Sequence, residues 1–478
     1  MKVVLISPYE IGRQPFALAQ PAAWLARDGF DVDCIDLSIE PFQAESVNGA
    51  QVVAFHLAMH TGARLAAELI PQVVANHSDA ALCVYGLYAP VNDEFFRSLG
   101  CEFVFGGEAE SDILALCRAV RDTGSLSELR ETRRSLDKLV FVRPLRSLLP
   151  ELDQYSYLTC ADGTEKTTGF VEASRGCRHL CRHCPVVPVY SGTFRVVSTD
   201  VVLEDIRQQI DAGAQHISFG DPDFLNGPGH ARRIIDRFQQ EYPGMTWDAT
   251  VKIEHLLRYE DLVGRFSEQN CLFITSAVES VENDVLEKLD KGHTAEDFRS
   301  ALHLLRRLGI SMHPTFVPFT PWTTSGGYLE LLRQIVELEL INGVAPVQLS
   351  IRLLLPRGSS LVDSEDRDEW LGPFNPKMLG YDWRHRDSRV DELQAIVQEW
   401  VIGAQDDNLT RMDIFAGIWT AAHQFVEGRV PELMRAAGRS VPQMSEPWYC
   451  CAEPTENLRK KTTKPVGPES LDESRLTA

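Results

Sequence analysis

Two stretches of the chain alternate between short apolar runs and longer segments in which apolar residues recur every three or four positions. In the first stretch the short runs are KVVLISPY, FDVDCIDLS, AQVVAFHLA, ALCVYGLY and CEFVFGG. Helical spacing lies between them, as at Phe16, Ala19, Ala23 and Trp24. Such alternation predicts βαβ units on a parallel sheet. We therefore expect residues 1–122 to form an α/β domain with an open parallel sheet.

This first domain has the pattern of a Rossmann-like fold, whose ligands bind beyond the carboxyl ends of the strands. No Gly-x-Gly-x-x-Gly follows its first strand, so the pattern disfavours a nicotinamide dinucleotide. Other residues that follow strands are therefore the candidate ligand contacts. They are Tyr9, His60, Gly106, Gly107 and Glu108.

The second alternating stretch predicts six strands separated by helices. Its apolar runs start at TGFVEAS and continue with QHISFGDPDF, TWDATVKI, LFITSAVES, ISMHPTFVPF and VQLSIRLLLP. We expect residues 167–361 to form a partial (β/α)6 barrel, with its active site at the carboxyl ends of the strands.

The remaining segments lack this alternation. Residues 123–166 are charged and irregular, and we expect a linker there. Residues 362–455 have a helical, charged pattern and predict a helical C-terminal region. Residues 456–478 are polar and contain Pro and Gly, which predicts a disordered tail.

Composition narrows the classes of partner. The chain of 478 residues is long enough for two or three domains. Its 68 acidic and 47 basic residues give a net charge of −21, which disfavours nucleic acid and anionic membranes as partners. No apolar run approaches the roughly 20 residues of a membrane span, and we find no secretory signal. We expect a cytoplasmic protein with reduced thiols.

Three of the eleven cysteines are clustered, in EASRGCRHLCRHCPVVP. They are Cys177, Cys181 and Cys184, directly after the first strand of the second series. Thiolates bind zinc or iron–sulfur clusters. A structural zinc ion takes four protein ligands, which here requires His179 or His183 as the fourth. A 4Fe–4S cluster held by three cysteines instead leaves one iron open for a substrate.

This triplet, with the preceding SRG, resembles the radical S-adenosylmethionine (SAM) superfamily. The resemblance implies a (β/α) barrel in which Cys177, Cys181 and Cys184 bind a 4Fe–4S cluster. The open iron then binds SAM, which is cleaved reductively to give a carbon radical. An external electron donor such as flavodoxin or ferredoxin is also implied.

The resemblance assigns SAM contacts to later motifs. In FGDPDF, Gly220, Asp221 and Pro222 match the motif that holds the methionine amino group. Glycine permits close backbone approach, and a carboxylate accepts hydrogen bonds from an ammonium group.

The resemblance assigns four further residues to the nucleoside and the methionine carboxylate. Glu279 and Ser280, in FITSAVES, match the position that holds the ribose. Arg352 offers a guanidinium fork to the carboxylate. His183 stands where family members usually carry an aromatic residue, and its ring is expected to cover the adenine.

A Rossmann-like domain ahead of such a barrel resembles the cobalamin-binding class of radical SAM enzymes. FGGEAE, which contains Gly106, Gly107 and Glu108, is typical of that class. The motif Asp-x-His-x-x-Gly is absent, and His60 or His56 is the candidate for the lower face of the cofactor. The resemblance implies a cobalamin-dependent transfer of a methyl or alkyl group to an unreactive centre.

The stretch EPWYCCAEP places Cys450 beside Cys451. It resembles the tail of radical SAM proteins that end in Cys-Cys-Ala-Glu-Pro or Cys-selenocysteine-Ala-Glu-Pro. Three roles stay open for the pair. It reduces or quenches an intermediate, it binds a soft element such as trivalent arsenic, or it is a surface pair without a role.

Two alternatives to the cobalamin-dependent enzyme stay open at this point. One is a radical SAM enzyme without cobalamin, which uses a 5′-deoxyadenosyl or 3-amino-3-carboxypropyl radical directly. The other is a zinc-stabilised module without catalytic activity. The sequence leaves the substrate, a small molecule or a peptide, undetermined.

Overall fold

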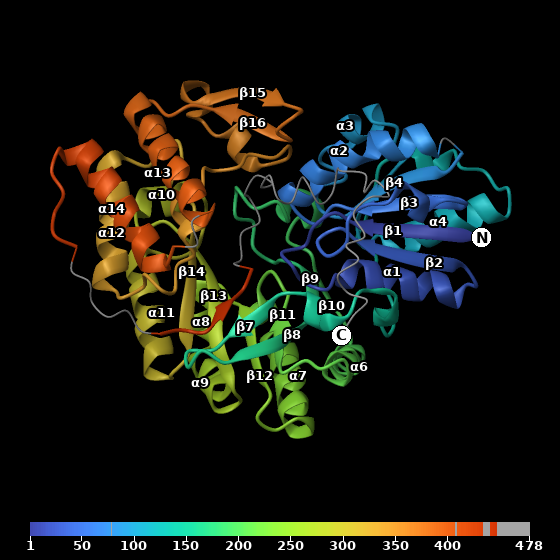
Figure 1. The fold of residues 1–478 in the computed structure, drawn as a ribbon, viewed down its shortest axis with the longest axis horizontal. Helices are drawn as coiled ribbons and strands as arrows, with labels where there is room; N and C mark the ends of the chain where they lie inside the picture. The colour runs from blue at the N-terminus through green and yellow to red at the C-terminus, as the bar shows by residue number, and fades with distance from the viewer. Residues whose placement is uncertain (78, 407–408, 434–439, 447–478) are drawn as a thin grey trace, which may run out of the picture. The chain divides into compact units, whose positions relative to one another are not determined.

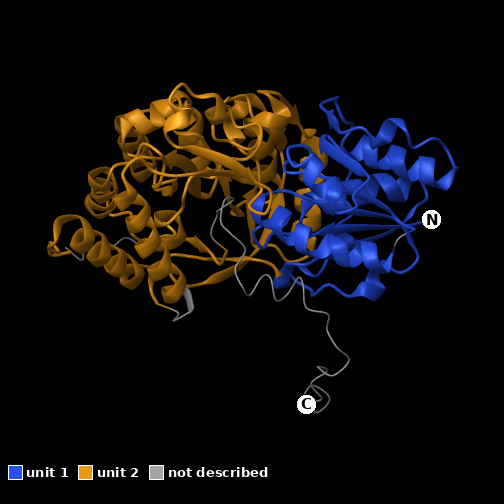
Figure 2. Cartoon of the chain, turned by 90° about the horizontal axis from the view of Figure 1, so that it is seen from above, with its two compact units in different colours: residues 1–154, 452–478 blue, residues 155–451 orange. Residues whose placement is uncertain are grey.

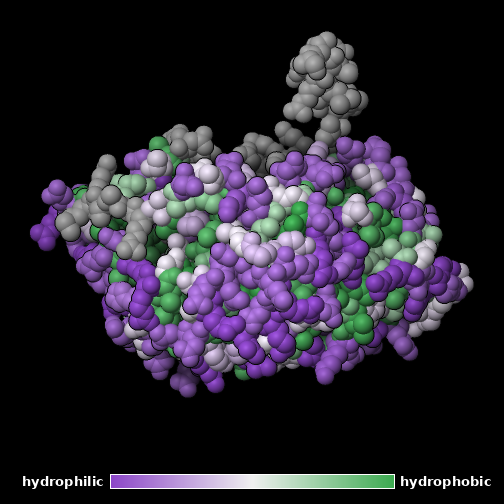
Figure 3. Space-filling view, turned by 90° about the horizontal axis from the view of Figure 1, so that it is seen from below, coloured by the Kyte–Doolittle hydropathy of each residue, from purple (hydrophilic) through white to green (hydrophobic). Residues whose placement is uncertain are grey.

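The computed structural model describes residues 1–77, 79–406, 409–433 and 440–446. The chain divides into two compact units, one formed by residues 1–154 and the other beginning at Tyr155 (Figure 2). Hydrophilic side chains cover most of the face drawn in Figure 3, in line with the high charge. Within the described residues, no helix is long and apolar enough to cross a membrane.

The first unit is built around a six-stranded parallel sheet in the order β2-β1-β3-β4-β5-β6 (Figure 1). Its strands are β1 (Lys2–Ser7), β2 (Asp31–Asp36), β3 (Ala50–His56), β4 (Ala81–Tyr85), β5 (Phe103–Gly107) and β6 (Arg133–Ser135). Its helices are α1 (Phe16–Arg27), α2 (His60–Asn76), α3 (Asp93–Ser98) and α4 (Glu110–Arg121). This confirms the predicted Rossmann-like α/β architecture, and adds the short elements α3 and β6.

Strand β1 lies between β2 and β3 and pairs in parallel with both. The order of the strands therefore reverses between β1 and β3. Ligands of open α/β sheets bind at the carboxyl ends of the strands beside such a reversal. Here those ends lead to Tyr9 after β1 and to His60 after β3.

The segment 123–166, expected to be a linker, is shared between the two units. Its strand β6 pairs with β5, and Leu145, Leu148 and Leu149 pack against the core of the first unit. Its last residues belong to the sheet of the second unit. The segment is therefore packed structure and not a free linker, because leucines spaced among its charged residues pack against the first unit.

The second unit contains a seven-stranded sheet in the order β14-β13-β12-β11-β8-β7-β17. Its strands are β7 (Tyr157–Thr159), β8 (Glu165–Val171), β11 (His216–Phe219), β12 (Thr246–Thr250), β13 (Cys271–Glu279), β14 (Ser311–Phe316) and β17 (Gln443–Met444). The five strands from β8 to β14 pair in parallel, and β7 and β17 add antiparallel edges. This is the core of the predicted partial barrel.

The sixth predicted strand is reduced to one bridge between Phe319 and Arg352. Before it, Pro346–Leu349 forms a 3₁₀ turn. The side-chain oxygen of Gln348 accepts a hydrogen bond of 3.2 Å from the backbone N–H of Phe316. A side chain therefore satisfies part of the edge of β14 that a sixth strand would have paired.

Helices cover the sheet, and two hairpins complete the second unit (Figure 1). The helices are α5 (Val187–Tyr190), α6 (Thr199–Asp211), α7 (Pro228–Glu241), α8 (Ile253–Arg258), α9 (Glu260–Glu268), α10 (Asn283–Lys288), α11 (Ala295–Arg307), α12 (Ser325–Glu337), α13 (Ser388–Asp406) and α14 (Arg411–Glu427). The hairpins are β9 (Ser174–Gly176) with β10 (Phe194–Val196), and β15 (Leu371–Asn375) with β16 (Gly380–Trp383). The predicted helical C-terminal region is confirmed by α13 and α14.

Candidate functional site

The three clustered cysteines lie on a loop that the β9–β10 hairpin closes. Gly176, at the end of β9, pairs with Phe194 of β10, so the two ends of the loop are held together. Gly176 has a φ of 71°, and a Cβ there would overlap the carbonyl oxygen of Thr193 and the ring of Tyr190. Only glycine fits this position, and it sets the direction in which the cysteine loop leaves the sheet.

All three cysteines are free thiols, with Cys181 buried and Cys177 and Cys184 half-buried. Burial raises the pKa of Cys177, and raises that of Cys184 to about 12. Buried thiols of this kind become thiolates only when a positive group replaces the lost hydration, as iron does. The chemistry of the three residues therefore fits an iron–sulfur cluster.

The spacing of the sulfur atoms disfavours a zinc ion at the triplet. Tetrahedral zinc with sulfur ligands at about 2.3 Å brings the sulfurs to about 3.8 Å from one another. Where the structure describes the chain, only one set of three metal-ligating side chains has its ligand atoms within 4.8 Å of one another, and the cysteine triplet is not that set. The three sulfurs are therefore not gathered around one point as a single zinc ion requires.

Polar and cationic groups surround the cysteine loop. The side-chain amide of Asn226 lies with its nitrogen 3.6 Å from the sulfur of Cys177, as a donor. The ammonium of Lys252 lies 4.0 Å from the sulfur of Cys181. Both contacts favour negative charge on sulfur, which thiolate ligands of a cluster carry.

Gly220 and Asp221 anchor the start of the cysteine loop. The buried carboxylate of Asp221 accepts hydrogen bonds from the backbone N–H of Ala173, at 3.0 Å, and from the hydroxyl of Ser174. Burial raises the pKa of Asp221 to about 7, against the opposing effect of these hydrogen bonds. A Cβ on Gly220 would overlap the ring of Phe170. Pro222 follows, half-buried. The contact of these residues with a methionine amino group stays a prediction.

His183 and Glu279, predicted from separate motifs, come together. The Nε2 atom of His183 lies 3.2 Å from Oε1 of Glu279, and the ammonium of Lys291 lies 3.0 Å from the same oxygen. Burial alone would raise the pKa of Glu279, but Lys291 and His183 outweigh it and hold this pKa far below its usual range. The site therefore contains a buried carboxylate that is ionised at neutral pH.

Ser280 and Arg352 have partners inside the protein. The buried hydroxyl of Ser280 accepts a hydrogen bond of 3.1 Å from the N–H of Glu282. The guanidinium of Arg352 donates to the carboxylate of Asp391 and to the carbonyl of Trp383, both at 2.6 Å, and covers the ring of Trp383. The contact of Arg352 with a methionine carboxylate stays a prediction, and this structure uses the side chain elsewhere.

In the first unit, Tyr9 and His60 lie at the strand reversal. Both are buried, and His60 begins α2. A Cβ added to Gly62 would come within 3.0 Å of the carbonyl oxygen of Tyr9, so the loop after β1 packs directly on the first turn of α2. This placement fits a ligand at the carboxyl ends of β1 and β3.

Gly106 and Gly107 end β5, which lies two strands beyond β3 in the sheet, and Glu108 follows it. A Cβ on Gly106 would overlap Pro90, and Gly107, with a φ of 71°, lies against the carbonyl of Ser135. The N–H of Glu108 donates to that same carbonyl at 2.7 Å. These residues join β5 to β6, so packing inside the unit accounts for them, and their contact with a cofactor stays a prediction.

The tail cysteines, Cys450 and Cys451, lie outside the described residues. Three groups around the cysteine loop were missed by sequence reasoning. Asn226, Lys252 and Lys291 are ordinary surface types by composition, and no periodicity marks them. The one available signal was indirect and marked only two of them, because Asn226 and Lys252 come in the segments directly after β11 and β12, whereas Lys291 lies beyond α10.

Comparison with known proteins agrees with this geometry. Residues 171–322 match the model of the radical SAM superfamily. Among curated proteins, the chain is 22% identical over 228 residues to bacteriochlorophyllide d C-12(1)-methyltransferase of Chlorobaculum tepidum. The aligned region covers 46% of this chain and 47% of that protein. The chain thus spans about half the length of this relative.

Two solved structures share the fold at low identity. The cobalamin-dependent SAM radical enzyme OxsB, with aqua-cobalamin bound, superposes with a TM-score of 0.66 at 16% identity, over 84% of this chain and 67% of that one. The radical SAM methyltransferase TsrM from Kitasatospora setae gives a TM-score of 0.57 at 15% identity, over 71% of this chain and 73% of that one.

The region around the cysteine loop is therefore a radical SAM domain. This confirms the family predicted from the triplet, and the fold of the described chain is that of cobalamin-dependent members of the family. The likeness of the tail to the Cys-Cys-Ala-Glu-Pro group stays a prediction.

Proposed function

We propose that this chain is a radical SAM enzyme in which Cys177, Cys181 and Cys184 hold a 4Fe–4S cluster. The observation that carries the proposal is the closed loop after β8, which places three free thiols, one buried and two half-buried, beside Lys252 and Asn226. When bound, the cluster and SAM supply a one-electron cleavage of the sulfonium that yields a carbon radical.

The chain's own residues position and protect this chemistry. Asn226 donates toward Cys177, and Lys252 stands beside Cys181, so both favour the thiolate forms. Glu279 is kept ionised by Lys291. Both of its described contacts use Oε1, and Oε2 is the oxygen that we assign to a ribose hydroxyl of SAM. His183, which contacts Glu279, is assigned to the adenine.

We further propose that the first unit binds cobalamin and that the reaction is the transfer of a methyl or alkyl group to an unreactive centre. Support comes from the strand reversal between β1 and β3, with Tyr9 and His60 at their carboxyl ends. The names of the similar proteins, a methyltransferase and two radical SAM enzymes described with cobalamin, agree with this choice. The substrate would be a small molecule or a peptide, and an external protein would supply the electron.

Anaerobic reconstitution with iron and sulfide tests the proposal. We expect about four irons and four sulfides per chain and cleavage of SAM by a one-electron reductant. Cys181→Ala should lose cluster and cleavage together. Cys160→Ala, which removes a half-buried thiol outside the loop, is the matched control and should keep both. A cluster that survives Cys181→Ala contradicts the assignment.

Adding cobalamin separates the two kinds of radical enzyme. A bound corrinoid spectrum, with S-adenosylhomocysteine formed only when cobalamin is present, supports the cobalamin-dependent transfer. Formation of 5′-deoxyadenosine or methylthioadenosine at the same rate without cobalamin supports direct use of the radical.

A further inference from the structure

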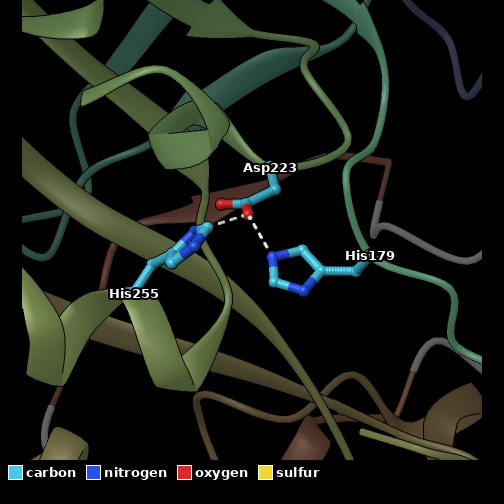
Figure 4. Close-up of side chains that lie close together, drawn as sticks. All are labelled: His179, Asp223 and His255. Atoms are coloured by element: carbon cyan, nitrogen blue, oxygen red, sulfur yellow. Dashed lines mark ion pairs between the residues drawn. The ribbon is translucent and has the colours of Figure 1, made fainter. Parts of the chain in front are cut away.

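Three metal-ligating side chains meet beside the cysteine loop. His179 comes from the loop itself, Asp223 from the turn after β11, and His255 from α8. Figure 4 shows both imidazole rings directed at the carboxylate of Asp223. Nothing in the proposed radical chemistry uses these residues.

The ligand atoms are spaced as around a single ion. Oδ2 of Asp223 lies 2.7 Å from Nδ1 of His255 and 3.6 Å from Nε2 of His179. All three atoms are within 4.8 Å of one another. Two ligand atoms at about 2.0–2.1 Å from one ion are about 2.8–3.4 Å apart at tetrahedral or octahedral angles. Shifts of a few tenths of an ångström bring the two distances to Asp223 to these values.

These atoms are buried and are not used by hydrogen bonds. Within the described residues, Nε2 of His179, Oδ2 of Asp223 and Nδ1 of His255 make no hydrogen bond of acceptable geometry. The side chain of Asp223 has no exposed area and that of His255 is 8% exposed. The described partners of these atoms are one another, as the ion pairs drawn in Figure 4. A bound ion would replace those pairs by ligand bonds and would satisfy buried polar atoms that make no hydrogen bond.

The carboxylate of Asp223 is already oriented for the role. Its other oxygen, Oδ1, accepts hydrogen bonds from the backbone N–H groups of Leu225, at 3.3 Å, and Lys252, at 3.4 Å. These contacts hold the group so that Oδ2 faces the two imidazoles. The free ring nitrogen of His179, Nδ1, lies 3.9 Å from a carboxylate oxygen of Glu254. Histidine ligands of metals are commonly supported by a carboxylate in this way.

One charge opposes a cation here, and it is partly compensated. The opposing charge is the ammonium of Lys252, which lies near His179. It also lies 3.7 Å from the carboxylate of Glu254, which partly neutralises it. Asp223 and Glu254 together therefore balance Lys252 and leave one negative charge for the ion.

We propose that His179, Asp223 and His255 bind one divalent transition-metal ion. Two imidazoles and one carboxylate suit iron(II), cobalt(II) or zinc, and disfavour magnesium and calcium, which take oxygen ligands. The ion joins the cysteine loop to the turn after β11 and to α8. With three protein ligands it keeps open positions, which suit water or an oxygen or nitrogen atom of a substrate. This site is distinct from the cluster and does not depend on it.

Cobalt(II) is the probe. Reconstituted protein with four sulfides per chain is treated with a mild chelator, given cobalt(II), desalted and measured by metal analysis and low-temperature electron paramagnetic resonance. The oxidised cluster is diamagnetic, so the high-spin cobalt signal is read without overlap. We expect about one cobalt per chain, with pulsed spectra that show coupling to two imidazole nitrogens.

Variants distinguish this ion from the cluster. Asp223→Asn and His255→Gln should each weaken cobalt binding by about 10-fold or more, while sulfide stays at four per chain. His303→Gln, an exposed histidine on α11, should change neither quantity. The sulfide count reports the cluster separately, so failure of one assignment is not read as failure of the other.

Three results would overturn the proposal. One is cobalt retention in the wild type no higher than in His255→Gln. Another is a cobalt(II) spectrum of the wild type that shows no coupling to imidazole nitrogen. This result does not depend on whether any variant folds. The third is stoichiometric release of cobalt by SAM, which would show that the three side chains belong to the SAM site.

Discussion

The pair formed by Lys291 and Glu279 gives the sharpest test of the electrostatics around the site. Both side chains are almost fully buried, 4% and 8% exposed, and the ammonium lies 3.0 Å from the carboxylate oxygen. At that distance, and at an effective dielectric constant of about 20, the attraction is about 5–6 kcal/mol. Lys291→Met keeps the length of the side chain and leaves Glu279 as a buried charge without its main partner. We expect the free energy of unfolding to fall by about 3–5 kcal/mol at pH 7.

The loss should depend on pH in a defined direction. In the wild type the pKa of Glu279 is held below its usual range, so the pair stabilises the protein above about pH 4.3 and the effect is lost as the pH falls further. In Lys291→Met, burial raises this pKa instead. The variant then takes up a proton on folding, and its unfolding free energy rises as the pH is lowered. The deficit relative to the wild type should therefore be smaller at pH 5 than at pH 7.

Urea unfolding followed by tryptophan fluorescence is the assay. Seven of the eight tryptophans lie beyond residue 154, so the signal reports mainly the second unit. Lys288→Met is the matched control, because its ion pair with Asp366 is less buried, with the side chains 42% and 16% exposed, and its loss should cost about 1 kcal/mol, well below the loss at Lys291. Glu279→Gln combined with Lys291→Met should recover more than half of the loss. An equal deficit at both pH values, or a double variant as unstable as the single one, would refute the reasoning.

Three further predictions concern the cysteine loop and its anchors. Gly176→Ala should lower the free energy of unfolding by about 1–3 kcal/mol, because the added Cβ meets the carbonyl of Thr193. It should also reduce the cluster content, measured as sulfide per chain. Gly163→Ala is the control and should keep the cluster, because Gly163 has a similar φ of 85° but open space around it. Asp221→Asn should flatten the pH dependence of stability between pH 4 and 7 in urea unfolding, because a raised pKa makes Asp221 most stabilising at low pH and less so as the pH approaches 7. An unchanged slope in that variant would count against a buried, protonated Asp221. Asn226→Leu should keep four irons but shift the reduction potential of the cluster to a lower value, measured by redox titration, because a donor to Cys177 sulfur is lost; an unchanged potential would show that the contact has no such role.

Features coded by neighbouring residues could be predicted from the sequence, and features made by distant ones could not. The spacing of Cys177, Cys181 and Cys184 is local, and the apolar runs mark each parallel strand. The contact of His183 with Glu279 joins residues 96 positions apart, and its third member, Lys291, carries no pattern of its own. Arg352 was assigned from the family resemblance and from the fork of its guanidinium, whereas its partner Asp391 comes from α13.

The sixth strand and the linker are two cases in which a local sequence pattern predicted a structure that the fold does not adopt. The run VQLSIRLLLP is apolar enough for a strand, but the amide of Gln348 bonds to the edge of β14 and leaves a single bridge. Residues 123–154 look like a linker by charge, yet their leucines pack on the first unit. In both cases tertiary packing decided between two locally reasonable structures.

The β9–β10 hairpin has a consequence for how the proposed cluster would bind. Because the hairpin ties Gly176 to Phe194, the entropy of closing the loop is lost when the chain folds, and not when the cluster binds. The proposed cubane would then have to order only the few residues that carry the sulfurs.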